Sequence, residues 1–436
     1  MGIVKIVLAL PVIYLCLLCT MLLEPVQRHL VFGHFIKFSG NDTLYFPENV
    51  GFGLNQVAPF WLDTEDRQAK LFGWHILPTD LYEKHREELR SIPSTEEIVD
   101  SGIIAEKHLE LLKQDLDARI IIYFHGQTGT IACRHRPDIY RSLLTTSLEH
   151  THIFTIDYRG FGLSTGQPTE DDVIRDGAYI VQEIARRTGL DPQTRISLVG
   201  QSLGTGVIIG VADLLAQLLP PIEINAVVPI AGFKSIQDLL TTFKLFGFYP
   251  VLGPFGYFEY TASRLSPLLM YKFNSAERLE RYMQNSETGK LLVIHAVNDE
   301  EIPFKHSLDL VVAALRGAGI VDSTDTVTTT QEDELTKLEE TQHVEEAVNF
   351  EQTVPFDTLE AASVTYALAH QFVFYQKQSA SLANIVDSST EIVQKTIPLD
   401  KNGPASRITM FASIWGGHMV VPKSTEVVLA LRRVLY

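Results

Sequence analysis

The chain has 436 residues, 45% of them hydrophobic, and a formal net charge of -17. Twelve acidic residues and one basic residue fall between positions 321 and 360, so most of the negative charge is local. Such a composition can bury a sizeable core, but it offers no basic, aromatic-rich surface, and we expect no nucleic-acid partner. The three cysteines and the scattered histidines lack metal-ligand spacing, so we expect neither a metal site nor a disulfide framework.

The N-terminus carries a candidate membrane segment. Residues 6–23 are uncharged and almost wholly apolar, which is about the length that spans a bilayer as a helix. We predict a single-pass anchor within residues 1–24, with a cleaved signal peptide as the alternative. Residues 25–69 form a lead-in whose first part mixes aromatic and basic residues, as expected of a segment at the bilayer surface. Asn41 begins a glycosylation sequon that is usable only on the lumenal side, and the orientation stays open.

The body of the chain, residues 70–436, alternates short apolar runs with amphipathic segments. Strands are expected at 70–78, 118–124, 152–157, 195–199, 225–230, 290–295 and 407–412. Helices are expected at 135–148, 170–187, 203–218 and 305–316, with a last helix ending at 435. This alternation predicts an α/β fold with a mainly parallel sheet and helices on both faces, and a functional site at the carboxyl ends of the strands.

Two segments interrupt the alternation. Residues 233–285 are rich in aromatics, prolines and glycines, and we predict a cap over a pocket, with a plain pair of connecting helices as the alternative. Residues 318–405 are acidic and rich in threonine, which predicts an insertion that is partly disordered and helical near 364–376. A tolerated solvent loop is a simpler explanation of this insertion than a regulatory element.

The sequence GQSLG at positions 200–204 lies between a β-branched run and an apolar helical segment. A serine on a sharp strand-to-helix turn projects its hydroxyl only if its neighbours leave room, which explains the glycines. Ser202 is therefore a candidate nucleophile at a helix N-terminus, where developing negative charge is stabilised. The alternative is a Gly-Ser turn that begins an ordinary helix.

A nucleophilic serine needs a general base and a carboxylate that orients it. In the serine-elbow architecture the chain order is serine, acid, histidine, and Asp299 and His418 fit this order because each follows a late strand. Glu300 and Glu301 are adjacent alternatives to the acid, but Asp299 comes first after the strand. Three other histidines fit less well, because of their places in a strand, at a helix start and in the insertion: His295, His306 and His370.

Hydrolysis of an acyl group also requires two backbone N–H groups that bind the developing oxyanion. Leu203, directly after the nucleophile, is expected to supply one of them. Gln127 is expected to supply the other, because it lies in the loop after the strand at 118–124, where lipases carry this donor.

Five motifs together resemble a known family. They are GWHILP at 73–78, HGQTGT at 125–130, DYRGFGLS at 157–164, GQSLGTG at 200–206 and HAVNDEEIP at 295–303. They resemble the membrane-anchored α/β-hydrolase-domain serine hydrolases of the lysophosphatidylserine lipase and monoacylglycerol lipase type. The resemblance implies the α/β-hydrolase fold, hydrolysis of lysophospholipid or monoacylglycerol esters without a cofactor, and a location in the endoplasmic reticulum membrane. Asn298 departs from the family pattern, in which a second aspartate is common, and the insertion before His418 is longer than expected.

Other functions use the same fold. A thioesterase that removes acyl groups from proteins would need the same three residues, and only its substrates would differ. A catalytically silent binding protein would keep the fold and lose a catalytic residue, but no expected role is vacant in this chain. A peptidase is a further possibility without any residue in its favour.

Overall fold

The computed structural model describes residues 20, 22–133, 135–242, 268–320, 372–375, 407–413 and 417–436. Nine strands of this part form one sheet in the order β1-β2-β4-β3-β5-β6-β7-β9-β8. The strands are β1 (Val57–Asp63), β2 (Lys70–Ile76), β3 (Arg119–Phe124), β4 (Thr151–Ile156), β5 (Ile196–Gln201), β6 (Ala226–Ile230), β7 (Lys290–Ala296), β8 (Phe372–Tyr375) and β9 (Ile408–Ser413). β2 pairs antiparallel with β1 and β4, and all other pairs are parallel.

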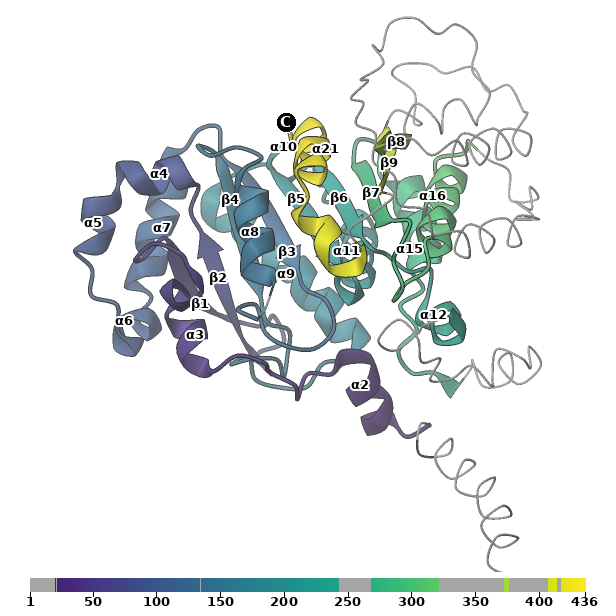
Figure 1. Ribbon diagram of the computed structural model, residues 1–436, viewed down its shortest axis with the longest axis horizontal. Helices are drawn as coiled ribbons and strands as arrows, with labels where there is room; N and C mark the ends of the chain where they lie inside the picture. Colours follow the sequence, from purple (N-terminus) through teal and green to yellow (C-terminus); the bar gives the residue numbers. More distant parts are fainter. Residues whose placement is uncertain are drawn as a thin grey trace, which may run out of the picture.

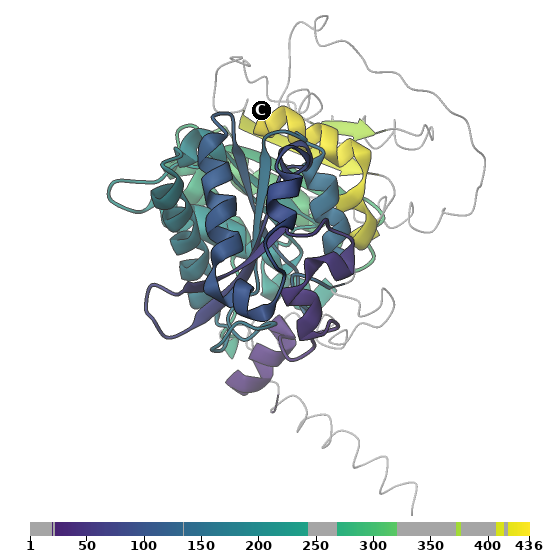
Figure 2. The ribbon, with the colours of Figure 1, turned by 90° about the vertical axis from the view of Figure 1, so that its left-hand side faces the viewer.

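Helices cover both faces of the sheet (Figures 1 and 2). One face packs against α9 (Glu170–Thr188), α11 (Leu203–Ala216), α15 (Ser275–Asn285) and α16 (Lys305–Gly317). The other packs against α8 (Arg136–Leu144) and α21 (Thr425–Leu435). The other described helices are α2 (Glu24–Phe32), α3 (Asn41–Tyr45), η1 (Pro47–Val50), α4 (Thr79–Lys84), α5 (Arg86–Arg90), α6 (Glu96–Ser101), α7 (Ile103–Gln114), α10 (Pro192–Arg195), α12 (Ile236–Thr242), α20 (Gly417–Val420) and η4 (Val421–Lys423). The predicted α/β class and the mainly parallel sheet are confirmed. Without the edge strand β8, the strand order is that of the α/β-hydrolase fold.

The central strands are buried on both faces because their side chains alternate between two cores. On β3, Ile120 and Ile122 belong to the core under α9 and α11, whereas Ile121 and Tyr123 belong to the core under α8 and α21. This pattern explains why the sequence of β3 is continuously apolar rather than alternating. The β-branched residues also suit an extended, pleated backbone.

Three observed segments differ from the expected elements. β1 lies within the expected lead-in and extends the sheet to residues before 70. α15, inside the expected cap at 233–285, buries Leu279, Tyr282 and Met283 in the main core, so this part belongs to the body of the domain. β8 replaces part of the helix expected near 364–376, because its run of aromatic and β-branched residues favours an edge strand. Residues 243–267 and most of the expected insertion lie outside the described residues.

The structure describes only a small part of the predicted N-terminal anchor. Residues 6–19 of the expected anchor lie outside the described residues. Within the described ranges, the helices are too short or too polar to cross a bilayer. The first fully described helix, α2, ends in the left-handed residue Gly33.

Lowering the pH should destabilise the fold through His108. Its imidazole is fully buried on α7 and donates from Nε2 to the carbonyl of Asn55 at 2.9 Å. Burial lowers the pKa of His108 to about 4, below the ordinary value of 6.5. As the pH falls below 6.5, the unfolded chain takes up this proton first, so the free energy of unfolding decreases by up to about 1.4 kcal/mol per pH unit until the folded state is protonated near pH 4.

Thermal unfolding of the wild type and His108→Gln between pH 7.5 and 4.5 measures this effect. The glutamine keeps a donor for Asn55 but does not titrate, so the variant should lose less stability at low pH. Equal losses in the two proteins would contradict the assignment.

Candidate active site

Ser202 occupies a strained turn between β5 and α11. Its backbone angles are φ 53° and ψ -121°, a combination that costs a non-glycine residue about 1–3 kcal/mol. The two motif glycines are required by close packing at this turn. A Cβ on Gly200 would lie 2.4 Å from the carbonyl oxygen of Gly204, and one on Gly204 would lie 2.1 Å from that of Phe124. The motif therefore forms the sharp strand-to-helix turn that the sequence predicts.

The turn places the serine at the N-terminus of a 14-residue helix. Its backbone N–H donates to the carbonyl of Ile230 on β6 at 3.1 Å, and its carbonyl accepts from the N–H of Thr205 at 2.8 Å. Leu203 is the first residue of α11, where an N–H group has no partner within the helix. The predicted first oxyanion donor thus lies next to Ser202, at the positive end of the helix dipole.

Asp299, in the loop after β7, and His418, in the short helix α20 after β9, come together. His418 Nδ1 donates to Asp299 Oδ2 at 2.8 Å. Asp299 Oδ1 accepts the backbone N–H groups of Glu301 and Ile302, each at 2.9 Å. Both side chains are buried, and these bonds orient the carboxylate toward the imidazole. Of the three adjacent acids of the sequence, Asp299 is the one whose carboxylate pairs with His418 Nδ1.

Burial and charge act in opposite directions on this pair. Burial disfavours the Asp299 carboxylate, but hydrogen bonds from His295 and His418 outweigh it and hold the pKa of Asp299 well below its usual range. Burial likewise lowers the pKa of His418, but the hydrogen bond and charge of Asp299 and the charge of Glu301 raise it above 6.5. An imidazole beside a permanent carboxylate can accept a proton at near-neutral pH, as a general base must.

Gln201, the residue before the serine, links the nucleophile turn to the histidine. Its Nε2 donates to the carbonyl of His418 at 3.0 Å, and its Oε1 accepts from the Tyr123 hydroxyl at 3.0 Å. These contacts hold the backbone of His418 beside β5. Within the described residues, Ser202 Oγ and His418 Nε2 form no hydrogen bond, and such bonds often tighten only when a substrate is bound. Sequence reasoning missed Gln201, because the motif leaves its second position open.

The rival histidines are differently placed. His295 is buried on β7, where its Nδ1 lies 2.6 Å from Ser307 Oγ. Its Nε2 donates to the carbonyl of Ile302 at 2.9 Å and lies 3.5 Å from Asp299 Oδ2. Both ring nitrogens are therefore occupied, and His295 supports the loop of Asp299. His306 is buried at the start of α16, and its pKa is lowered to about 4 by burial. His370 lies outside the described residues.

The loop after β3 lies against the nucleophile turn. A Cβ on Gly126 would be 3.2 Å from Ser202 Cβ and 3.8 Å from its Oγ, so a larger residue here would crowd the nucleophile. Gln127 follows with an exposed side chain, which donates to the carbonyls of Leu30 and Val31 at the end of α2. The backbone N–H of Gln127 has no hydrogen-bond partner among the described residues.

The N-terminal segment is packed against this same loop. The N–H of Thr128 donates to the carbonyl of Phe32 at 3.0 Å, and that of Gly129 donates to the carbonyl of Ile36 at 2.7 Å. Residues 25–69 are expected from the sequence to form a lead-in, and their pattern gives no sign of this contact, because it depends on hydrogen bonds between distant backbone groups. The lead-in is thus part of the surroundings of the site.

In the part of the chain that the structure describes, no metal centre accompanies this arrangement. No group of three or more histidine, cysteine, aspartate or glutamate side chains is arranged there to hold a metal ion. A cavity of about 330 Å³ lies instead between the β1–β2 edge and α9, lined by residues such as Phe60, His75 and Glu183. Its lining does not include Ser202, Asp299 or His418, so this cavity is separate from the candidate active site.

Removing the Glu301 charge should move the pH dependence of activity. Glu301 Oε2 lies 3.8 Å from His418 Nε2 and contributes to the raised pKa of that imidazole. Catalysis requires neutral His418, so activity is expected to fall as the pH drops through this raised pKa. In Glu301→Gln the acidic limb of the kcat/KM profile should shift to lower pH, with an unchanged plateau.

Glu300→Gln is the matched control, because Glu300 is the neighbouring exposed acid without a contact to His418 among the described ion pairs. Its profile should coincide with that of the wild type. An acidic limb that does not move in Glu301→Gln would refute the role given to this charge.

This chain is similar in sequence to several named proteins. No family model matches the sequence. Lysophosphatidylserine lipase ABHD12 of Gallus gallus is 27% identical over 279 residues, which cover 64% of this chain and 64% of that protein. Protein ABHD12B of Homo sapiens is 28% identical over 191 residues, covering 44% of this chain and 48% of that protein. A solved alpha-beta hydrolase from Vibrio vulnificus has a TM-score of 0.43 at 14% identity, over 68% of this chain and 84% of that chain.

The chain spans less than two thirds of the length of the curated relatives it matches. The similarity confirms the resemblance drawn from the motifs.

Proposed function

We propose that this chain is a serine hydrolase that cleaves acyl esters of lysophospholipids or monoacylglycerols. The observation that carries the proposal is the pairing of a strained serine at a helix N-terminus with a buried Asp299–His418 pair held next to it through Gln201. Relatives named as lysophosphatidylserine lipases support the lipid-ester substrate class. The proposed machinery consists of side chains and backbone N–H groups and uses no cofactor.

The chemistry follows from the positions of these groups. Ser202 Oγ attacks the ester carbonyl while His418 Nε2 accepts its proton, and Asp299 stabilises the resulting imidazolium. The N–H groups of Leu203 and Gln127 bind the oxyanion of the tetrahedral intermediate. His418 then returns the proton to the leaving alcohol, which departs and leaves an acyl group on Ser202. Water, activated by the same histidine, hydrolyses this acyl-enzyme.

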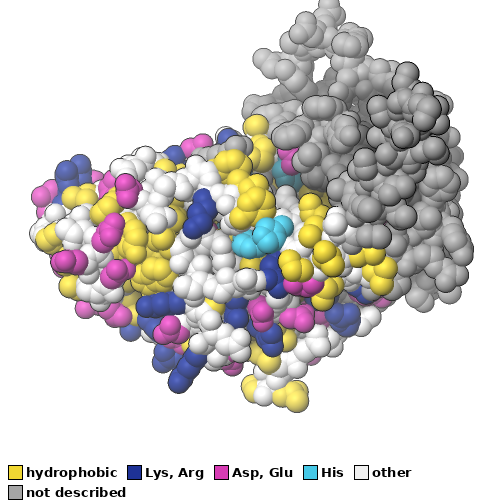
Figure 3. All heavy atoms as spheres, turned by 90° about the horizontal axis from the view of Figure 1, so that it is seen from below, with side chains coloured by type: hydrophobic (Ala, Val, Ile, Leu, Met, Phe, Trp, Pro, Cys, Tyr) yellow, Lys and Arg dark blue, Asp and Glu magenta, His cyan; other side chains and the backbone are white. Residues whose placement is uncertain are grey.

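We also propose that the N-terminal side of the domain faces a bilayer. Large apolar side chains are exposed just before α2, on it and just after it, at Leu23, Leu30, Phe35 and Phe38. Figure 3 views the molecule from the side of α2 and shows hydrophobic side chains interspersed with histidine, basic and acidic ones. Such a mixture suits the lipid headgroup region. The anchor at residues 1–24 and the endoplasmic reticulum location belong to this proposal, and retention of the full chain in membranes after an alkaline wash would test the anchor.

Substrate profiling tests the proposed activity. Membranes that contain the wild type or Ser202→Ala are incubated with lysophosphatidylserine, a monoacylglycerol and a palmitoyl thioester peptide. Release of fatty acid from either lipid by the wild type alone would support the proposal. Turnover of the thioester alone would favour the thioesterase alternative, and equal hydrolysis by both proteins would refute a role for Ser202.

A further inference from the structure

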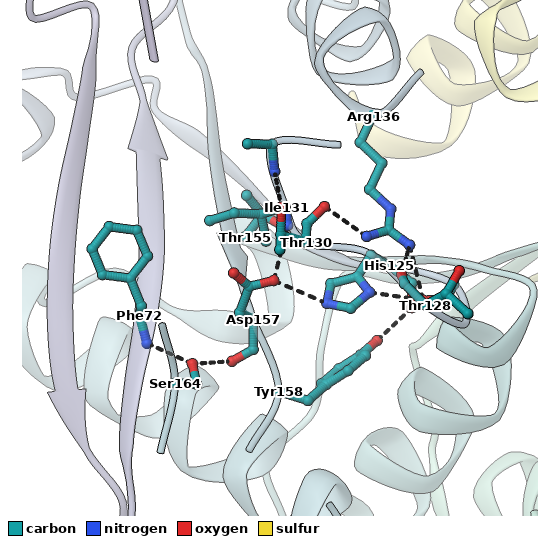
Figure 4. Close-up of polar contacts among 12 residues, drawn as sticks. Phe72, His125, Thr128, Thr130, Ile131, Arg136, Thr155, Asp157, Tyr158 and Ser164 are labelled. Atoms are coloured by element: carbon teal, nitrogen blue, oxygen red, sulfur yellow. Dashed lines mark hydrogen bonds and ion pairs between the residues drawn. The ribbon is translucent and has the colours of Figure 1, made fainter. Parts of the chain in front are cut away.

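The loop after β3 surrounds one buried guanidinium group (Figure 4). Arg136, in the first turn of α8, is 3% exposed and donates only to backbone carbonyls. The distances are 3.0 Å to Gly126, 3.3 Å to Gln127, 2.7 Å to Thr128 and 2.6 Å to Thr130. Among the described residues it forms no ion pair with a carboxylate. Burial of an arginine is unfavourable unless many hydrogen bonds compensate it, so this side chain is committed to the loop.

The contacts of Arg136 determine how the peptide groups of the loop are turned. A trans peptide is planar, so each carbonyl points opposite to the N–H of the next residue. Three successive carbonyls, those of residues 126–128, point toward Arg136. The N–H groups of residues 127–129 must therefore point away from it. Positive φ angles of 59° at Thr128 and 68° at Gly129 accompany this arrangement.

The three N–H groups that point away have different partners. Those of Thr128 and Gly129 donate to carbonyls of the N-terminal segment, at Phe32 and Ile36. That of Gln127 has no partner among the described residues, and the preceding glycine packs against Ser202. The N–H of Gln127 is thus the one of these three donors without a partner among the described residues, and it lies beside the nucleophile.

We propose that Arg136 is a positioning residue of the oxyanion hole, which holds the Gly126 carbonyl so that the N–H of Gln127 is aimed at the substrate. This inference rests on the proposed hydrolase function and adds a residue that does not itself touch the substrate. His125 assists, because its Nδ1 donates to the same Gly126 carbonyl at 2.8 Å. A lysine would keep the charge but offers one nitrogen where the arginine uses two, since Nη2 contacts the carbonyls of residues 126–128 while Nη1 donates to that of Thr130.

Kinetics of Arg136→Lys test the proposal in the full chain. A misaligned donor weakens binding of the transition state but not of the ground state, so kcat for p-nitrophenyl acetate should fall about 10- to 100-fold with KM nearly unchanged. The rate of Ser202 labelling by a fluorophosphonate should fall by a similar factor, because the phosphoryl oxygen occupies the same site. Hydrogen exchange at the amides of residues 127–129 should accelerate.

Arg159→Lys is the matched control for loss of a buried arginine. Arg159 is 5% exposed and binds the carboxylate of Asp176 with two hydrogen bonds, at 2.7 and 2.8 Å, rather than the loop. Compared at equal folded fraction, measured by thermal unfolding, this variant should keep the wild-type kcat.

The outcomes separate this inference from the function on which it rests. An active wild type with an equally active Arg136→Lys would overturn the positioning role alone. A loss of kcat without faster exchange in the loop would also overturn it, because the arginine would then act by another route. A folded wild type that neither hydrolyses esters nor is labelled at Ser202 would refute both proposals.

Discussion

Ser202→Ala is expected to reduce ester hydrolysis by about 10⁴-fold or more while the protein stays folded, because it removes the atom that forms the acyl-enzyme. The residual rate would come from the oxyanion donors and substrate binding alone. The matched control is Ser197→Ala, which removes a buried hydroxyl at the other end of the same strand, where it accepts a hydrogen bond from Asn225. That variant should keep its activity. Hydrolysis of a lysolipid by the three proteins is the measurement.

The same position offers a test of the backbone strain. Ser202 has a positive φ that glycine adopts without cost, so Ser202→Gly should unfold at a higher temperature than Ser202→Ala. The free energy of unfolding of Ser202→Gly is expected to exceed that of Ser202→Ala by an amount on the order of 1 kcal/mol. Neither variant should be active. A glycine variant that is less stable than the alanine variant would contradict the strained-turn interpretation.

Asp299→Asn should lower kcat by about 10³- to 10⁴-fold. The amide can keep an oxygen toward the N–H groups of Glu301 and Ile302, so the loop should stay in place. Its NH₂ group would then face His418 Nδ1 and favour the tautomer that carries its proton on Nε2. That tautomer cannot accept the serine proton, so the nucleophile loses its general base.

Asp115→Asn is the control for loss of a histidine-bound carboxylate. Asp115 contacts His150 at 2.8 Å and His152 at 3.4 Å, away from Ser202. Its variant should retain the wild-type kcat even if it unfolds more readily. Steady-state kinetics at matched folded fractions distinguish the two aspartates, and equal losses would contradict the special role of Asp299.

The sequence predicted those parts of the fold that depend on local pattern. The apolar run that forms β3 and the motif around Ser202 both encode their conformation in consecutive residues, and the structure has a strand and a sharp turn there. Chain order then narrowed the choice of acid and base to Asp299 and His418. In the structure, Asp299 Oδ2 lies 2.8 Å from His418 Nδ1. Their catalytic roles stay predictions.

Features that depend on distant contacts were not predictable in this way. Arg136 lies in a helix that the sequence predicted. The residues next to it in the sequence, however, do not indicate that its side chain donates hydrogen bonds to four carbonyls of the preceding loop. The contact of Phe32 with the same loop joins backbone groups that are about a hundred positions apart, a distance at which hydrophobic periodicity carries no information. Such contacts become visible only when the fold is known.

At the end of the expected cap, the prediction gave more weight to amino-acid composition than to the spacing of apolar residues. The aromatics and prolines at 233–285 predicted a cap, yet α15 has a clear apolar face formed by Leu279, Tyr282 and Met283, which packs into the main core. Attention to that spacing would have assigned the helix to the body of the domain. The strand β8 was missed because alanine, leucine and glutamine are frequent on both sides of its four residues, a composition that favours a helix.

The most direct test of a catalytic Ser202 is to identify the residue that reacts with a fluorophosphonate probe. The full chain in membranes is labelled, digested and analysed by mass spectrometry, with His418→Ala in parallel. We expect the wild type to carry the phosphonyl group on Ser202 and labelling nearly to disappear in His418→Ala. A folded wild type that remains unlabelled, or that is labelled at another residue, would contradict the claim that Ser202 is the nucleophile.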